Sequence, residues 1–384
     1  MSLEKKYINI IFYISFSMIL ILQMFLSASS LKYINIISPL SNLKYLFLLF
    51  LIIRIFFISY KVKHFFLFIF IGSLLAVSYI KSGSTTLLIS YILIISAKDI
   101  DFTKLLKVFI SVLSVSSIFI ILLSQANIIE NLQIIRQDTG DLRYALGFGH
   151  PNTLGLVVLL VCMSWMYIRF DNLNFIDYIS WALLALLIDQ VVDSRTSLYM
   201  ILLLLFLTII FKMFGNVIMK FNISKLLLIL MFPLFSLLSI WFTVQYDRTN
   251  PLFVLINQLV SGRIRLANYF YNEYGFSLFG QKITLIGTIE SLYIPGASPQ
   301  LLDNVYLQLI IRFGFISLLI FCGCYIFLIN KCIKEKNIAL IICIILMAIY
   351  GLTEAYPINV IYNFTLIAIL STTNLKQKFK LYRM

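Results

Sequence analysis

The sequence predicts an all-α integral membrane protein, and three observations lead to that prediction. The chain has 384 residues, of which 61% are hydrophobic and 12% charged, and its mean hydropathy is +0.99. A soluble domain of ordinary composition does not carry that much apolar surface. Apolar stretches of roughly 20 residues, the length at which a helix crosses a bilayer, recur about twelve times, and lysines cluster between alternate stretches. We therefore expect residues 1–384 to form one polytopic membrane domain.

The expected spans can be justified in order along the chain. The first apolar stretch follows Glu4–Lys6 and lacks a clear small-residue cleavage site, so we expect it to remain as the first helix. Each later stretch is bounded by polar or charged residues, and those at 84–97 and 358–373 are the shortest. The full series is 7–27, 43–60, 65–81, 84–97, 105–124, 152–168, 175–191, 196–213, 226–244, 304–330, 338–356 and 358–373.

The lysines predict the orientation of these spans. Cytoplasmic loops of membrane proteins carry an excess of positive charge, and here each lysine cluster falls on the same side of the twelve-span arrangement. An even number of spans then places both termini in the cytoplasm. The clusters are Lys5/Lys6, Lys61/Lys63, Lys98/Lys104/Lys107, Lys212/Lys220/Lys225, Lys331/Lys334/Lys336 and Lys376/Lys378/Lys380.

Composition also excludes several classes of function. The net charge of +14 is accounted for mainly by lysines that face anionic lipid, so nucleic acid is not an expected partner. The five cysteines are expected within spans or at their cytoplasmic edge, where disulfides do not form. The sequence has no metal-ligand spacing and no glycine-rich nucleotide loop, so neither a metal nor a cofactor is expected.

A long polar segment, 245–303, separates the ninth and tenth spans and is expected on the outer side of the membrane. Loops of this length are usually functional or disordered, and this one is rich in aromatic residues. Apolar residues recur at helical spacing after Ser261, which indicates an amphipathic helix on the outer leaflet. Arg263 in its first turn would add a cation to free backbone amides, a combination that favours phosphate. The alternative is an interfacial helix with solvated charges.

Arginines, unlike lysines, gather on the expected outer side. A guanidinium group offers a planar fork of donors that binds phosphate in a bidentate manner and does not deprotonate, so the cluster indicates an anion site. The alternative is separate ion pairing with nearby aspartates, namely Asp138, Asp141, Asp193 and Asp247. The outer arginines are Arg136, Arg143, Arg195, Arg248, Arg263 and Arg265.

Two candidate residues lie at the start of expected helices on the outer side. His150 precedes Pro151, which suits the first turn of the sixth span, and Asn152 can help to satisfy the free amides there. His150 is therefore a candidate general base, a candidate hydrogen-bond donor to a phosphate group, or a structural residue that bridges helices. Arg195 lies in a turn too short to leave the bilayer surface, so it either pairs with a neighbouring aspartate or faces a polar cavity.

The entry to the tenth span supplies the remaining candidates. Asp303 is either a helix cap or a catalytic carboxylate, and Asn304 and Tyr306 follow it directly. Arg312 lies deeper and needs a partner, for which Glu354, near the outer end of the eleventh span, is a candidate. On these grounds the candidate substrate-binding residues are Arg143, Arg265, Asn152, Asn304, Tyr306, Arg248 and Glu354.

Four motifs, in this order, resemble those of the Wzy-type polysaccharide polymerases, which are relatives of the O-antigen ligases. They are GHPNTLG at 149–155, DSRTS at 193–197, SGRIRL at 261–266 and DNVYLQLIIRFG at 303–314. The resemblance extends from about Arg143 to the end of the chain. It implies a GT-C-like fold with a long extracytoplasmic loop before the tenth span.

The resemblance also implies an activity. It is the joining of oligosaccharide repeat units carried on undecaprenyl diphosphate, at the outer face of the bacterial plasma membrane, without metal or cofactor. Arg195 and Arg263 would engage the lipid diphosphate, with Arg143 and Arg265 in support. Asp303 and His150 are both candidates for the base, because the related ligases have a histidine near the position of Asp303. Expected partners are a repeat-unit flippase and a chain-length regulator.

Two alternative functions stay open at this point. A lipid-linked oligosaccharide flippase or other transporter is also a basic protein with many spans, but it needs charges along a path through the middle of the membrane. An O-antigen-type ligase performs the same chemistry on a different acceptor. Asp303–Asn304, in place of a histidine-bearing motif, favours the polymerase.

Overall fold

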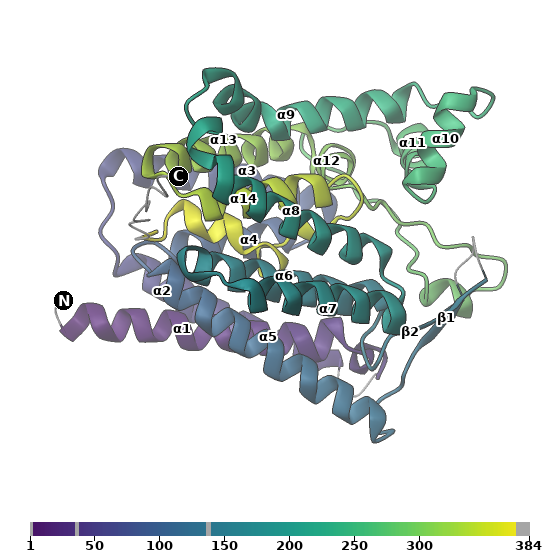
Figure 1. Cartoon of the computed structure of the whole chain (residues 1–384), viewed down its shortest axis with the longest axis horizontal. Helices are drawn as coiled ribbons and strands as arrows, with labels where there is room; N and C mark the ends of the chain where they lie inside the picture. Colours follow the sequence, from purple (N-terminus) through teal and green to yellow (C-terminus); the bar gives the residue numbers. More distant parts are fainter. Residues whose placement is uncertain (1–2, 35–37, 136–139, 374–384) are drawn as a thin grey trace.

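The computed structural model of the chain describes residues 3–34, 38–135 and 140–373, and it is mostly helical (Figure 1). Within these ranges, nine helices are long and apolar enough to cross a membrane, which confirms a helical multi-pass membrane protein. They are α1 (Leu3–Gln23), α2 (Leu43–Phe56), α3 (Val62–Ser82), α5 (Phe102–Gln125), α6 (Pro151–Arg169), α7 (Phe175–Val192), α8 (Arg195–Ile218), α9 (Asn222–Val244) and α13 (Phe315–Glu335).

Two shorter apolar helices, α4 (Thr86–Ser96) and α14 (Ile338–Tyr350), complete the bundle in the described part of the chain. The predicted number of about twelve regular spans is thus not reproduced. The long predicted loop contains α10 (Pro251–Leu259) and α11 (Arg263–Tyr274), so a helix is present where the amphipathic pattern predicted one. Ala267 and Phe270 on α11 are buried, and Arg265 and Tyr269 on the same helix are exposed.

Helix α6 is the centre of the bundle. In the most apolar stretch of α6, 72% of the residues are buried, whereas the corresponding share is 17% for α2 and for α3. It packs against α5, α7, α8 and α14, which surround it in Figure 1. Pro151 occupies its first turn, where a missing backbone N–H costs nothing. The residues that begin α6 are therefore held rigidly at the edge of the apolar core.

The tenth predicted span, 304–330, is not one continuous helix. It divides into α12 (Val305–Gln308), a π-helical turn at Leu309–Phe313 and α13, and Gly314 lies at the break. Gly314 has a positive φ of 94°, and a Cβ atom there would overlap the backbone of Phe279 and Gly280. The Gln281 amide donates to the Arg312 carbonyl oxygen at 2.9 Å. The long loop thus returns to the bundle and bonds to the backbone that the broken helix leaves open.

We expect Gly314→Ala to destabilise the protein strongly. A residue with a side chain costs roughly 1–2 kcal/mol in the left-handed region, and the overlap with Gly280 adds to this. Thermal unfolding in detergent, followed by size-exclusion chromatography, measures the loss. Gly323→Ala is the matched control, because Gly323 lies within α13 and its new methyl group would meet no atom within 4 Å. Equal stability of the two variants would contradict the structural role of the break.

The last predicted span, 358–373, is not a regular helix either. It forms three short 3₁₀ turns, Tyr356–Ile358, Val360–Tyr362 and Phe364–Ile369. The buried Asn363 side chain donates to the Pro357 carbonyl oxygen and to the Tyr325 hydroxyl, each at 2.7 Å. Irregular backbone at membrane depth is tolerated only where protein surrounds it, and this segment is almost wholly buried. The prediction of a twelfth helix was therefore wrong.

A short β-hairpin is a second departure from the predicted fold class. Strands β1 (Gln133–Ile135) and β2 (Leu142–Tyr144) pair antiparallel, with Ile134 opposite Arg143. Ile134, together with Leu132, Ala145 and Ile289, forms a small apolar cluster apart from the main core. The hairpin is thus joined to the long loop that follows α11, and the alternation of its residues turns Arg143 inward.

Two of the predicted lysine clusters, those around Lys98 and Lys331, meet at one end of the bundle. The Lys331 ammonium group donates to the carbonyl oxygens of Ala368 and Ser371 at 2.8 and 2.9 Å, and the Asp99 amide donates to that of Leu370. Figure 1 shows the start of α1 at this end, with α10, α11 and the β-hairpin at the other. The separation agrees with the sorting of lysine and arginine, although which end faces the cytoplasm stays a prediction.

Candidate functional site

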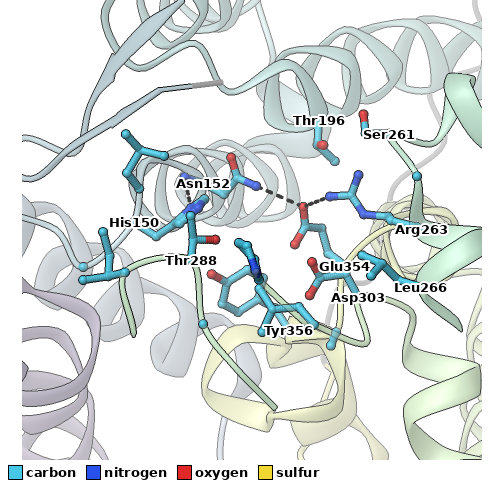
Figure 2. Close-up of a pocket in the computed structure, with 18 of the residues that line it drawn as sticks. His150, Asn152, Thr196, Ser261, Arg263, Leu266, Thr288, Asp303, Glu354 and Tyr356 are labelled. Atoms are coloured by element: carbon cyan, nitrogen blue, oxygen red, sulfur yellow. Dashed lines mark hydrogen bonds and ion pairs between the residues drawn. The ribbon is translucent and has the colours of Figure 1, made fainter. Parts of the chain in front are cut away.

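A cavity of about 1100 Å³ opens at the end of the bundle that carries the β-hairpin and α11. Its walls come from the starts of α6 and α8, the turn between α10 and α11, the loop before α12 and the segment after α14. Figure 2 shows a close-up of part of it. Predicted site residues that line it are His150, Asn152, Arg143, Arg195, Arg263, Arg265, Asp303 and Glu354.

Two glycines permit the helices around the cavity to approach closely. A Cβ atom on Gly155 of α6 would overlap the hydroxyl groups of Ser194 and Ser197 at the start of α8. The missing side chain lets α6 and α8 begin side by side, so Asn152 and Arg195 line the same space. A Cβ atom on Gly149 would likewise overlap the Lys32 side chain.

A chain of polar contacts joins two arginines across the cavity through Glu354. The Arg263 Nη2 atom donates to Glu354 Oε1 at 2.8 Å, and Asn152 Nδ2 donates to the same oxygen at 3.2 Å. The other end of the Asn152 amide accepts from Arg143 Nη2 at 2.6 Å. Glu354 is only 3% exposed, so its charge depends on these donors. The chain fixes side chains from α6, α11, β2 and the segment after α14 relative to one another.

Asp303 lies beside this chain of contacts. Figure 2 shows its carboxyl group next to that of Glu354, with Arg263 and Tyr356 nearby. Burial raises the pKa of Asp303, and the positive charge of Arg263 opposes that change. Burial likewise raises the pKa of Glu354 to about 7, again against Arg263, while the negative charge of Asp303 adds to the rise. Two adjacent carboxyl groups with raised pKa values are well placed to accept and hold a proton near neutral pH.

Arg143 and Arg195 share Asp193. Arg143 Nε lies 3.8 Å from Asp193 Oδ2, and Arg195 Nε lies 3.7 Å from Asp193 Oδ1. Asp193 ends α7 with a positive φ of 49°, which turns the chain sharply towards α8. The two interpretations of these arginines in the sequence are therefore compatible, since both side chains pair with an aspartate and both line the cavity.

His150 caps α6 rather than standing free. Its Nδ1 atom accepts the Asn152 backbone N–H at 3.1 Å, so in the neutral ring the proton lies on Nε2. Burial and, to a smaller extent, the charges of Arg143, Lys32 and Arg263 together lower the pKa of His150 to about 3. At neutral pH the ring is uncharged and has no lone pair left to accept a proton. Of the two candidates for the base, this geometry favours Asp303.

Three predicted site residues lie elsewhere. Asn304 is buried, caps α12 through the Leu307 amide and donates to Ser239 Oγ and to the Leu352 carbonyl oxygen. Tyr306 is fully buried, and its hydroxyl group donates to the Ala348 carbonyl oxygen at 2.8 Å. Arg248 is exposed in the turn before α10 and does not line the cavity. Asn304 and Tyr306 are candidates because they follow Asp303 in sequence, and Arg248 because it belongs to the outer arginine cluster.

The structure also corrects the expected partner of Glu354. Glu354 pairs with Arg263, so its expected pairing with Arg312 was wrong. Arg312 instead lies over the ring of Phe313, with 5.3 Å from the guanidinium carbon to the ring centroid. Arg136 and Asp138 lie outside the described residues.

Sequence reasoning missed Lys32, Glu290 and Tyr356, which also line the cavity. Lys32 follows the first span and therefore lies on the arginine side, against the sorting of lysines. A lysine on the arginine side could have been recognised from the sequence as a further candidate cation of the site, and its ammonium group does lie at the cavity wall. Burial lowers the pKa of Lys32, and the negative charge of Glu290 opposes that change.

Comparisons of the chain with known protein families, with curated proteins and with solved structures each found no match. A functional interpretation therefore rests on the geometry of the cavity and on the motifs quoted above. Among the residues that the structure describes, no group of three or more His, Cys, Asp or Glu side chains is placed to hold a metal ion.

Proposed function

We propose that the protein is a polysaccharide polymerase that joins oligosaccharide repeat units carried on undecaprenyl diphosphate. In this proposal the cavity opens at the outer face of the bacterial plasma membrane, and both termini are cytoplasmic. The observation that carries the proposal is that several cations and two neighbouring carboxyl groups, the buried Glu354 and the partly exposed Asp303, line a single cavity. The cations are Lys32, Arg143, Arg195, Arg263 and Arg265.

The cations suit a diphosphate leaving group. When a sugar leaves a lipid diphosphate, negative charge develops on the phosphate oxygen, and fixed guanidinium groups stabilise that charge. Arg263 and Arg195 lie at the starts of α11 and α8 and line the cavity, and the positive end of a helix dipole also favours anions. A volume of about 1100 Å³ is at the upper end for small-molecule sites and has room for a diphosphate together with sugar rings.

The carboxyl pair suits the second requirement, removal of a proton from the acceptor. In the proposed reaction, the acceptor hydroxyl oxygen bonds to the anomeric carbon of the donor while the bond from that carbon to the diphosphate oxygen breaks. The electron pair of the broken bond leaves with the diphosphate, and Asp303 takes the hydroxyl proton. Because the leaving group is already activated, cations and one base are sufficient.

The charges favour an enzyme over a transporter. A transporter would need charged groups along a path through the bundle. The cavity charges instead gather at one end, and Arg54 of α2 is engaged by the carbonyl oxygens of Ile8 and Lys98 and by the Asn9 side chain. A ligase would use the same cavity with a different acceptor.

The proposal is tested by purifying the protein, reconstituting it in liposomes and supplying a labelled lipid-diphosphate-linked repeat unit. A polymerase produces a ladder of products on a gel. A transporter produces no ladder and moves the labelled lipid across the bilayer. A product that contains a single added chain on a different acceptor would indicate a ligase.

Two exposed arginines of the same loop provide a matched pair for this assay. Arg265 lines the cavity and its guanidinium group makes no ion pair with any described residue, whereas Arg248 lies outside the cavity. We expect Arg265→Ala to raise the KM for the donor about fivefold to tenfold, because one charge-assisted contact is lost. Arg248→Ala is expected to leave the KM unchanged. Equal effects of the two substitutions would contradict the placement of the donor.

A further inference from the structure

Arg263 lines the cavity, and one edge of its guanidinium group is only half used. The Nε and Nη2 atoms of a guanidinium group form one edge that can bind two oxygens side by side. In Arg263 the Nη2 atom donates to Glu354, whereas the buried Nε atom has no hydrogen-bond partner. A phosphate group with two free oxygens would satisfy both atoms of this edge. To do so, the phosphate group must displace Glu354 as the hydrogen-bond acceptor of Nη2.

The surroundings of Glu354 do not allow it to keep a negative charge once Arg263 turns to a phosphate group. Asn152, from α6, is neutral, and the charge of Arg143, which donates to that amide, also lowers the pKa of Glu354 but less than the charge of Arg263 does. Asp303, in the loop before α12, is another acid. The remaining ionisable groups near Glu354 are the uncharged side chains of Tyr350, at the end of α14, of Tyr356, just after Glu354, and of His150, before α6.

A phosphate group and two carboxylates around one guanidinium would place three negative charges in a buried space. Acidic groups that lie next to one another do not all stay ionised, because protonation of one carboxylate reduces their repulsion. Burial already raises the pKa of Glu354 to about 7, against the influence of Arg263. Loss of Arg263 to a phosphate raises that pKa further. Asp303 is partly exposed to the cavity, where an acceptor hydroxyl can reach it.

We propose that Glu354 competes with the donor for Arg263: the carboxylate holds the arginine, and a phosphate group of the donor replaces it while Glu354 takes one proton from solvent. This inference rests on the proposed function, and it assigns Glu354 a role opposite to that of a substrate-binding residue. Asp303 stays the base. Without its cation the Asp303 carboxylate is a stronger base, so donor binding itself prepares the proton transfer from the acceptor.

The test is isothermal titration calorimetry of the full-length protein in nanodiscs with a polyprenyl-diphosphate-linked monosaccharide. Both phosphates of this probe are esterified and do not titrate near neutral pH, so any proton uptake belongs to the protein. Below about pH 7 Glu354 is already protonated, and little uptake is expected. As the pH rises above that value, we expect uptake to approach about one proton and the donor affinity to fall by about tenfold per pH unit.

Glu354→Gln keeps the shape of the side chain and removes the competing charge. We expect this variant to bind the probe several-fold more tightly than wild type at about pH 8, without proton uptake. Asp303→Asn is the matched control, because it removes the neighbouring carboxylate and is expected to retain proton uptake.

The outcomes separate this inference from the proposed function. Affinity that does not change with pH in the wild type, or weaker binding by Glu354→Gln at every pH, overturns the competition but leaves the polymerase intact if the ladder still forms. Absence of both binding and ladder overturns the proposed function and this inference together. Proton uptake that disappears in Asp303→Asn but persists in Glu354→Gln would assign the proton to Asp303 instead of Glu354, and this result also overturns the competition.

Discussion

Asp303→Asn is expected to reduce the rate of polymer formation by roughly 10²–10⁴-fold, the usual contribution of a general base. The substitution keeps the size of the side chain and leaves the Arg263–Glu354 ion pair in place, so folding should be unaffected. It removes the carboxylate that receives the acceptor proton. The measurement is the initial rate of chain growth at saturating donor, together with donor affinity, which is expected to stay near the wild-type value.

His150→Gln is a useful comparison for that experiment. The histidine caps α6 through Nδ1, and a glutamine side-chain oxygen can take over part of that role. If Asp303 is the base, the histidine variant loses much less activity than the aspartate variant. A wild-type rate for Asp303→Asn combined with an inactive His150→Gln would contradict our assignment of the base.

Arg263→Gln is expected to have the second large effect, on stability as well as activity. It leaves Glu354, which is 3% exposed, without its cation, and breaking a buried ion pair in this way costs about 3–5 kcal/mol. Because removal of Arg263 raises the pKa of Glu354 above its wild-type value of about 7, the loss should be largest at alkaline pH and become small below about pH 7, where the carboxyl group is neutral in both proteins. Thermal unfolding across this pH range measures the effect.

The double variant Arg263→Gln/Glu354→Gln separates the two effects. With both charges removed, no buried carboxylate is left unpaired at this position, so we expect thermal stability to return towards that of the wild type. Donor binding and polymer formation should stay lost, because the guanidinium group itself is missing. A double variant that recovers polymer formation would show that Arg263 serves only to neutralise Glu354.

The helical class of the fold and most of the long helices follow from hydropathy alone, because spans of roughly 20 apolar residues have few alternatives in a membrane. The departures occur where tertiary contacts outweigh that pattern. Residues 304–330 are apolar enough for one helix, but backbone from Gly280 occupies the space at Gly314. In the last predicted span, the Asn363 side chain donates to the carbonyl oxygen of Pro357, and burial within protein makes the irregular backbone tolerable.

The residues of the candidate site were partly predictable. Sorting of arginine from lysine identified Arg143, Arg195, Arg263 and Arg265, all of which line the cavity. Proximity in sequence was a weaker guide, because the side chains of successive residues point in different directions: Asp303 lines the cavity, whereas Asn304 caps α12. The partner of Glu354 depends on how α11 packs against the bundle, which no local pattern encodes.

The most direct test of our account is a structure of the protein in nanodiscs with a lipid-diphosphate-linked sugar, determined by electron cryo-microscopy. We predict that the diphosphate lies in the cavity with oxygens on Nε and Nη2 of Arg263, that Glu354 has moved away from that arginine, and that the sugar lies within reach of Asp303. A diphosphate bound at the lysine-rich end of the bundle, or one in the cavity without contact to Arg263, would contradict the account.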